Sequence, residues 1–170
     1  MGYFILEKVG KVYKTGCVML YVNLSLDELH DEIDKDDLTD DGIEDEPHIT
    51  LLYGLKSVSN DKVKDAIESI KFGEVKLEKV SLFEKEKYDV VKFDVSGDGL
   101  QEAFKKLNKL PNDNKYPDYH PHITLAYVKV GQGKKYVKMF SKEKLTAKPM
   151  FAVYSPGGDK DKIIISIKKK

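Results

Sequence analysis

A heptapeptide that occurs twice constrains the fold of this chain more than any other feature of its sequence. Residues 47–53 read PHITLLY and residues 121–127 read PHITLAY, so the two copies differ only at their sixth position. Alternate side chains of a strand share a face. In each copy the His and the Thr therefore point one way, and the Ile and the first Leu point the other. Each copy is predicted to be a strand with one polar and one core face, and the repeat indicates two halves of similar build.

The remaining segments predict an α+β fold without a linker between the halves. Residues 1–170 are therefore expected to form a single domain with approximate twofold symmetry. Strands are predicted from β-branched and aromatic content at residues 17–24, 74–83 and 88–95, and in a closing hairpin at 150–168. Helices are predicted from apolar residues at helical spacing at residues 25–33, 60–70 and 99–110.

Composition excludes several classes of function. The chain has no run of eighteen apolar residues, and its start, MGYFILEKVGK, lacks the pattern of a signal peptide. We therefore expect a cytoplasmic protein without a membrane partner. The formal net charge is zero, so no overall field attracts nucleic acid. All basic residues are Lys, so phosphate binding must use Lys, hydroxyls or backbone amides in place of a guanidinium clamp.

Two local features are interpreted as structural. Cys17 is the only cysteine and lies in an apolar run, which predicts a buried thiol. The acidic stretch at 27–46 is interpreted as a solvated surface, with His30 exposed among the acids. It lacks the ligand spacing of an EF-hand, so calcium binding is not predicted.

The polar face of the repeat carries the residues for acid–base chemistry on a phosphate. One neutral imidazole can take a proton from an attacking hydroxyl or water, and a second, protonated imidazole can give one to the leaving oxygen. A Thr hydroxyl can donate to a non-bridging phosphate oxygen as charge develops. The candidate catalytic residues are His48, Thr50, His122 and Thr124, and the pattern does not assign acid and base between the two His.

These residues have two alternative interpretations, a structural role and a zinc site. A single His in a strand is usually structural, but two copies in matching contexts favour function. His120 and His122, two residues apart, could form a zinc site with His48. We disfavour zinc because the position that matches His120 in the first copy is Glu46. No metal or other cofactor is therefore predicted.

These motifs resemble a known superfamily. PHITL from residue 47 and YHPHITLAY from residue 119 are similar to the paired His-x-Thr strands of the 2H phosphoesterases, which include bacterial 2'-5' RNA ligases and RNA cyclic phosphodiesterases. DGIEDEPHITLLYGL and YHPHITLAYVKVGQGKKY most resemble phage and prophage members that destroy cyclic oligonucleotide signals, the anti-CBASS phosphodiesterases. The resemblance covers most of the chain.

The resemblance implies a bilobal fold, with two antiparallel-sheet lobes related by pseudo-twofold symmetry around a central cleft. It also implies metal-independent cleavage of a phosphodiester, the four His and Thr residues as the catalytic tetrad, and the host cytoplasm as the location of a phage-encoded protein. Candidates for substrate binding are Tyr13, Phe83, Tyr116 and Tyr119, by stacking on bases, and His120, by shaping the pocket.

Two residue pairs and the choice among three functions remain as expectations. Tyr53 and Tyr127 are placed in the core by alternation, and Lys134 and Lys135 are either phosphate contacts or part of a solvated turn. The favoured function is cleavage of a small cyclic nucleotide or oligonucleotide, with no obligate protein partner. The alternatives are processing of RNA ends that carry 2',3'-cyclic phosphates or 2'-5' linkages, and a non-catalytic nucleotide sponge. Long RNA is disfavoured because the chain lacks Arg and an acidic stretch precedes His48.

Overall fold

The computed structural model describes residues 15–56, 58–158 and 160–170, and its class is α+β, as predicted. Most of it is antiparallel sheet, with few helices. None of the helices in these ranges is long and apolar enough to cross a membrane. The main strands are β1 (Gly16–Asn23), β2 (Leu38–Ile43), β3 (His48–Leu55), β5 (Val75–Glu84), β6 (Asp89–Ser96), β7 (His122–Val128), β8 (Leu145–Ser155) and β9 (Ile163–Ile165). The helices are α2 (Asp27–Asp31), the 3-10 helix η1 (Lys35–Asp37), α3 (Asn60–Glu68), α4 (Leu100–Asn108) and α5 (Gly133–Met139).

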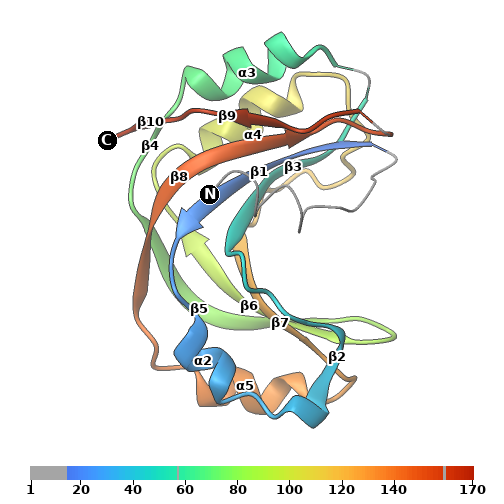
Figure 1. Ribbon diagram of the computed structural model, residues 1–170, viewed down its shortest axis with the longest axis vertical. Helices are drawn as coiled ribbons and strands as arrows, with labels where there is room; N and C mark the ends of the chain where they lie inside the picture. The colour runs from blue at the N-terminus through green and yellow to red at the C-terminus, as the bar shows by residue number, and fades with distance from the viewer. Residues whose placement is uncertain (1–14, 57, 159) are drawn as a thin grey trace.

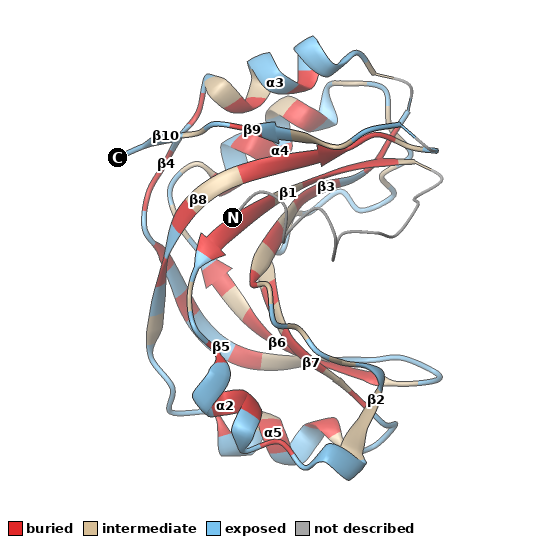
Figure 2. Ribbon diagram, viewed as in Figure 1, coloured by how far each residue is buried: buried red, intermediate tan, exposed pale blue. Residues whose placement is uncertain are grey.

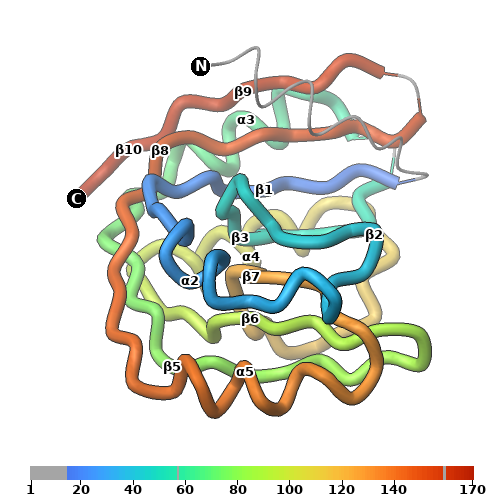
Figure 3. Tube along the Cα trace, turned by 60° about the horizontal axis from the view of Figure 1, so that its bottom comes forward, coloured from blue at the N-terminus to red at the C-terminus, as the bar shows by residue number. Residues whose placement is uncertain are grey.

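The strands form one strongly curved sheet in the order β1-β3-β7-β6-β5-β8-β9 (Figure 3). Strand β8 is long enough to pair twice, with β5 through residues 145–147 and with β1 through residues 148–155. The path from β1 to β8 therefore closes on itself. A short parallel pair, β4 (Lys71–Phe72) with β10 (Lys168–Lys169), lies apart from this sheet.

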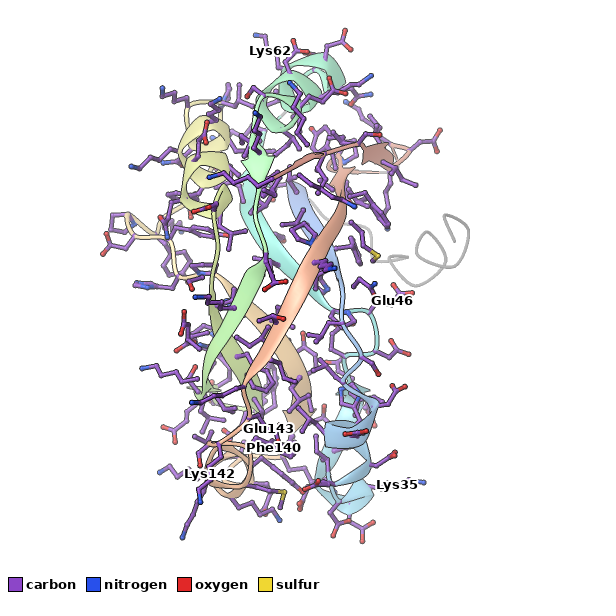
Figure 4. The ribbon with its side chains drawn as sticks, turned by 90° about the vertical axis from the view of Figure 1, so that its left-hand side faces the viewer. Lys35, Glu46, Lys62, Phe140, Lys142 and Glu143 are labelled. Atoms are coloured by element: carbon purple, nitrogen blue, oxygen red, sulfur yellow. The ribbon has the colours of Figure 1, made fainter. Side chains whose placement is uncertain are left out.

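The helices gather at the two ends of the curved sheet. Helices α3 and α4 lie at one end, and α2 and α5 lie at the other (Figure 1). Lys62 on α3 and Lys142 after α5 mark these opposite ends in Figure 4. Apolar side chains of the helices and strands form the buried core (Figure 2).

The two motif strands meet at the narrowest pairing in the sheet. Strands β3 and β7 pair through Ile49 and Ile123 alone, whereas β1 with β3 and β6 with β7 pair along most of their length. We call the two sides of this β3–β7 seam the β1 flank (β3, β1, β8 and β9) and the β6 flank (β7, β6, β5 and β2). The seam places both copies of the heptapeptide at the centre of the sheet.

The predicted helices at 60–70 and 99–110 and the closing hairpin are confirmed as α3, α4 and β8–β9. Besides η1, β4 and β10, which are short, strand β2 and helix α5 were not predicted. Strand β2 lies in the acidic stretch and pairs with β7, although its sequence, LTDDGI, has no pattern that predicts a strand. The turn at GQGKKY opens α5, because the buried Asp89 carboxylate accepts the Gly131 and Gly133 amides at 3.0 and 3.1 Å.

Candidate active site

The motif residues lie in two rows across one face of the sheet. Because Ile49 pairs with Ile123 in an antiparallel register, the His of each copy lies across from the Thr of the other copy. The two His are then diagonal neighbours, a relation that separates residues by about 7–8 Å. Each row has one residue from each of β1, β3, β7, β6 and β5, in that order. The first row is Tyr21, His48, Thr124, Lys92 and Ser81. The second row is Met19, Thr50, His122, Asp94 and Lys79.

Both imidazoles are held in the same orientation by the backbone. His48 Nδ1 donates to the carbonyl oxygen of Glu46 at 2.9 Å, and His122 Nδ1 donates to that of His120 at 3.1 Å. A carbonyl only accepts, so Nδ1 carries the proton in each ring and Nε2 is the nitrogen left for chemistry. Each ring also rests on an aromatic neighbour, Tyr21 for His48 and Phe83 for His122, at 5.4 and 5.3 Å between centroids.

A β-bulge follows the Thr in both copies and corrects one prediction. The pairing skips Leu51 between β1 and β3, and it skips Leu125 between β7 and β6. The extra residue reverses the alternation, so Tyr53 and Tyr127 do not join the core. Tyr53 is 51% exposed. Burial raises the pKa of Tyr127, and a side-chain hydrogen bond with Thr124 on the polar face opposes that rise.

A cavity of about 760 Å³ opens beside the row that contains Thr50 and His122. Four of the predicted substrate-binding residues line it: Phe83, Tyr116, Tyr119 and His120. Tyr13 lies outside the described residues. His48 and Thr124 are not part of the cavity wall and occupy the adjacent row, so the cavity lies to one side of the pair of imidazoles.

The loop between α4 and β7 forms one wall of this cavity. It is fixed to the end of β3, because the Asp113 amide donates to the Gly54 carbonyl at 2.8 Å and its carboxylate pairs with Lys56 at 2.8 Å. Gly54 has φ 102°, a backbone conformation that favours glycine. The loop therefore holds Tyr119 against the motif strand: its hydroxyl donates to the Thr50 carbonyl at 2.8 Å.

We expect Tyr119→Phe to destabilise the protein by about 0.5–1.5 kcal/mol, because it removes this hydrogen bond while keeping the ring stacked on Phe104. Urea unfolding measures the loss. Tyr116→Phe is the matched control, since Tyr116 is 76% exposed. Equal midpoints for the two variants would show that the Tyr119 hydroxyl does not anchor β3.

A charged network on the same polar face was not predicted from the sequence. Lys92 is 6% exposed, and its ammonium donates to Ser81 Oγ and Asp94 Oδ1, both at 2.6 Å. Ser81 Oγ donates to Asp94 Oδ1 at 2.7 Å. The sequence carries a signal for this network, because Lys92 and Asp94 occupy alternate positions of the otherwise apolar run VVKFDV.

The prediction that His30 is exposed is wrong. His30 is 9% exposed, and its Nε2 donates to the carbonyl oxygen of Leu125 on β7 at 3.0 Å. The same carbonyl accepts the Glu44 amide at 3.0 Å. His30 therefore holds the bulge that follows Thr124.

Three other expectations have clear outcomes. Cys17 is buried, as predicted, and burial raises the pKa of its thiol to about 11. Lys134 and Lys135 lie on α5 and pair with Glu84 and Asp37, away from the cavity wall. Within the ranges that the structure describes, no three His, Cys, Asp or Glu side chains are grouped as metal ligands, so the geometry does not assemble the alternative zinc site.

The fold and this geometry define a class: an α+β protein whose antiparallel sheet presents paired His-x-Thr strands beside an aromatic-walled cavity. A family model described as anti-CBASS protein Acb1 matches residues 21–150. The chain belongs to this Acb1 family. Membership indicates a phage anti-CBASS function, and that role implies a cyclic oligonucleotide as the target. No curated protein matches the chain.

Proposed function

We propose that the protein is a phosphodiesterase that cleaves small cyclic oligonucleotides in the host cytoplasm by two-histidine acid–base catalysis, without a metal. The observation that carries the proposal is the matched pair of imidazoles: each has Nδ1 tied to the backbone, leaving Nε2 for proton transfer, and each lies across from a Thr on one face of the sheet. Family membership supports the choice of a cyclic oligonucleotide.

The proposed reaction uses the four motif side chains directly. A ribose 2'-hydroxyl attacks the adjacent phosphorus and gives its proton to Nε2 of one imidazole. The bond from phosphorus to the leaving oxygen breaks, and that oxygen takes a proton from Nε2 of the other imidazole. The Thr50 and Thr124 hydroxyls donate to the non-bridging oxygens as charge develops. The ring opens to a linear product that ends in a 2',3'-cyclic phosphate.

The cavity supports a small substrate. Its volume of about 760 Å³ falls in the range of small-ligand sites, and Phe83, Tyr116 and Tyr53 offer rings on which bases can stack. Asp94 and Asp118 share its wall with Lys85 and Lys92. This mixed charge suits a compact nucleotide better than a long polyanion.

The sheet also supports the resemblance to 2H phosphoesterases within one domain. Each motif strand belongs to a four-stranded antiparallel flank, and the flanks meet at the β3–β7 seam and again where β5 pairs with β8. Both copies share the backbone tie on the imidazole and the bulge after the Thr. We propose that the flanks are the two lobes, related by pseudo-twofold symmetry through the Ile49–Ile123 pair.

One panel of substrates tests the function. The purified protein is incubated in excess EDTA with cyclic di-AMP, cyclic di-GMP, cyclic tri-AMP and an RNA carrying a 2',3'-cyclic phosphate end, with the His48→Ala/His122→Ala double variant as the blank. We expect ring opening that persists in EDTA. Cleavage of the RNA end alone would favour the RNA-processing alternative, and ring binding without turnover would favour a sponge. Loss of all activity in EDTA would contradict metal independence.

A further inference from the structure

The two proposed catalytic imidazoles have different neighbours, although their own strands match. The flanking pairs are Tyr21 with His48 on β1 and Asp94 with His122 on β6. The same strand pairings place Met19 across from Thr50 and Lys92 across from Thr124. One imidazole thus lies beside a tyrosine and a methionine, and the other beside a carboxylate and an ammonium.

The ammonium of Lys92 is a fixed charge at this site. A buried ammonium is unfavourable unless its donors are satisfied. Two of its contacts are Ser81 Oγ and Asp94 Oδ1, and it also lies 4.3 Å from the centroid of the Phe83 ring. The ammonium therefore has two hydrogen-bond acceptors and one aromatic face as partners. These contacts hold the charge of Lys92 beside Asp94.

The Asp94 carboxylate accepts a hydrogen bond from Lys92 and lies across from His122 in the sheet. Burial acts to raise the pKa of Asp94, but the hydrogen bonds from Lys92 and Ser81 outweigh it, so the pKa lies below its ordinary value. Asp94 is consequently ionised at neutral pH. A lone carboxylate across from His122 would favour the imidazolium form, and Lys92 supplies the opposing charge.

The balance of these effects leaves His122 neutral. Burial lowers the pKa of His122 most, and the hydrogen bond to the His120 carbonyl opposes this effect. The charge of Lys92 lowers the pKa, that of Asp94 raises it and that of His48 lowers it. The pKa of His122 therefore lies below its ordinary value of about 6.5. A neutral imidazole at pH 7 can accept a proton.

We propose that His122 is the base of the reaction, because Lys92, held by Ser81 and Asp94, prevents the Asp94 carboxylate across from His122 from keeping that imidazole protonated; His48 is then the acid. This inference rests on the proposed function and assigns the two roles within it. Lys92 and Asp94 act through His122 and are positioning residues. The charged and titratable groups around His122 are Lys92 and Asp94 of β6, Lys79 of β5, His48 of β3, Lys85 after β5, and Asp118, Tyr119 and His120 of the preceding loop.

Charge-pair variants test the network. The ring protons of His122 are assigned with a His122→Gln variant and titrated by NMR in the wild type, Lys92→Met, Asp94→Asn and the double variant. We expect Lys92→Met to move the His122 titration to higher pH and Asp94→Asn to move it to lower pH, with the double variant close to the wild type. Lys76→Met, an exposed lysine on β5, is the matched control and leaves the titration in place.

The same variants have a kinetic signature. The base must be deprotonated, so kcat/KM rises with pH through the titration of the base. For Lys92→Met we expect kcat/KM at pH 6, on a cyclic nucleotide that the wild type cleaves, to fall about tenfold and to recover toward pH 8. For Asp94→Asn we expect the rise of kcat/KM with pH to move to lower pH. If Lys92→Met does not fold, the Asp94→Asn variant tests the inference by itself.

Two results would overturn the inference. A His122 titration that stays in place in both single variants would show that the network does not set its protonation. A higher KM at every pH with an unmoved titration would identify Lys92 as a phosphate ligand. The NMR titration does not depend on catalytic activity, so it tests the network independently of the proposed function. Failure of the proposed function would appear as full activity of His48→Ala or His122→Ala.

Discussion

Replacing His48 or His122 with alanine is expected to lower kcat for ring opening by about 10²- to 10⁴-fold, the usual contribution of one general acid or base. Each replacement removes one of the two Nε2 atoms that transfer protons. It also removes the hydrogen bond between that imidazole and the backbone carbonyl that orients it. We expect the double variant to lose little more than the worse single variant, because the two groups act as a unit. Rates of product formation under saturating substrate measure these losses.

His120→Ala is the matched control for this prediction. His120 is exposed, and it orients His122 through its backbone carbonyl, which the substitution keeps. As a residue of the cavity wall it is expected to change KM more than kcat. A loss in kcat as large as that of His122→Ala would instead show that the His120 imidazole takes part in the chemistry. That result would favour the zinc alternative.

Ile123→Ala is expected to destabilise the protein by about 2–5 kcal/mol, the usual cost of truncating a fully buried Ile. The Ile123 side chain is 0% exposed and lies in the buried layer directly beneath the polar face, between Ile49 of β3 and Phe93 of β6. Because β3 and β7 pair only at this position, the cavity would form at the β3–β7 seam, next to both motif strands. The free energy of unfolding in urea measures the loss.

Ile164→Ala, on β9, is the control for this substitution, because Ile164 is 43% exposed. We expect it to change stability by less than about 0.5 kcal/mol. The Ile123→Ala protein that remains folded is also expected to lose kcat, since a shift of about 1 Å between catalytic groups can cost 10²-fold in rate. Wild-type kcat in a strongly destabilised variant would show that the seam sets stability without setting the geometry of the site.

The site was partly predictable from local pattern. The repeat predicted two strands with a His and a Thr on one face, and the structure contains both strands. Alternation then placed Tyr53 and Tyr127 on the wrong face, because a bulge changes the count by one residue and leaves no mark in composition. His30 was misplaced for a similar reason: its neighbours in sequence are acidic, but its neighbour in space is β7.

The α+β class, the core and polar faces of the motif strands and the main amphipathic helices could be predicted from the sequence, because these features follow from periods of two and 3.6 residues within one segment. Three relations could not be predicted and come from the folded chain: the two strands are neighbours in one sheet, each His lies across from the Thr of the other copy, and Lys92 and Asp94 lie beside His122. These relations depend on the register between distant segments, which is set by packing across the whole sheet and is not encoded in any one of them.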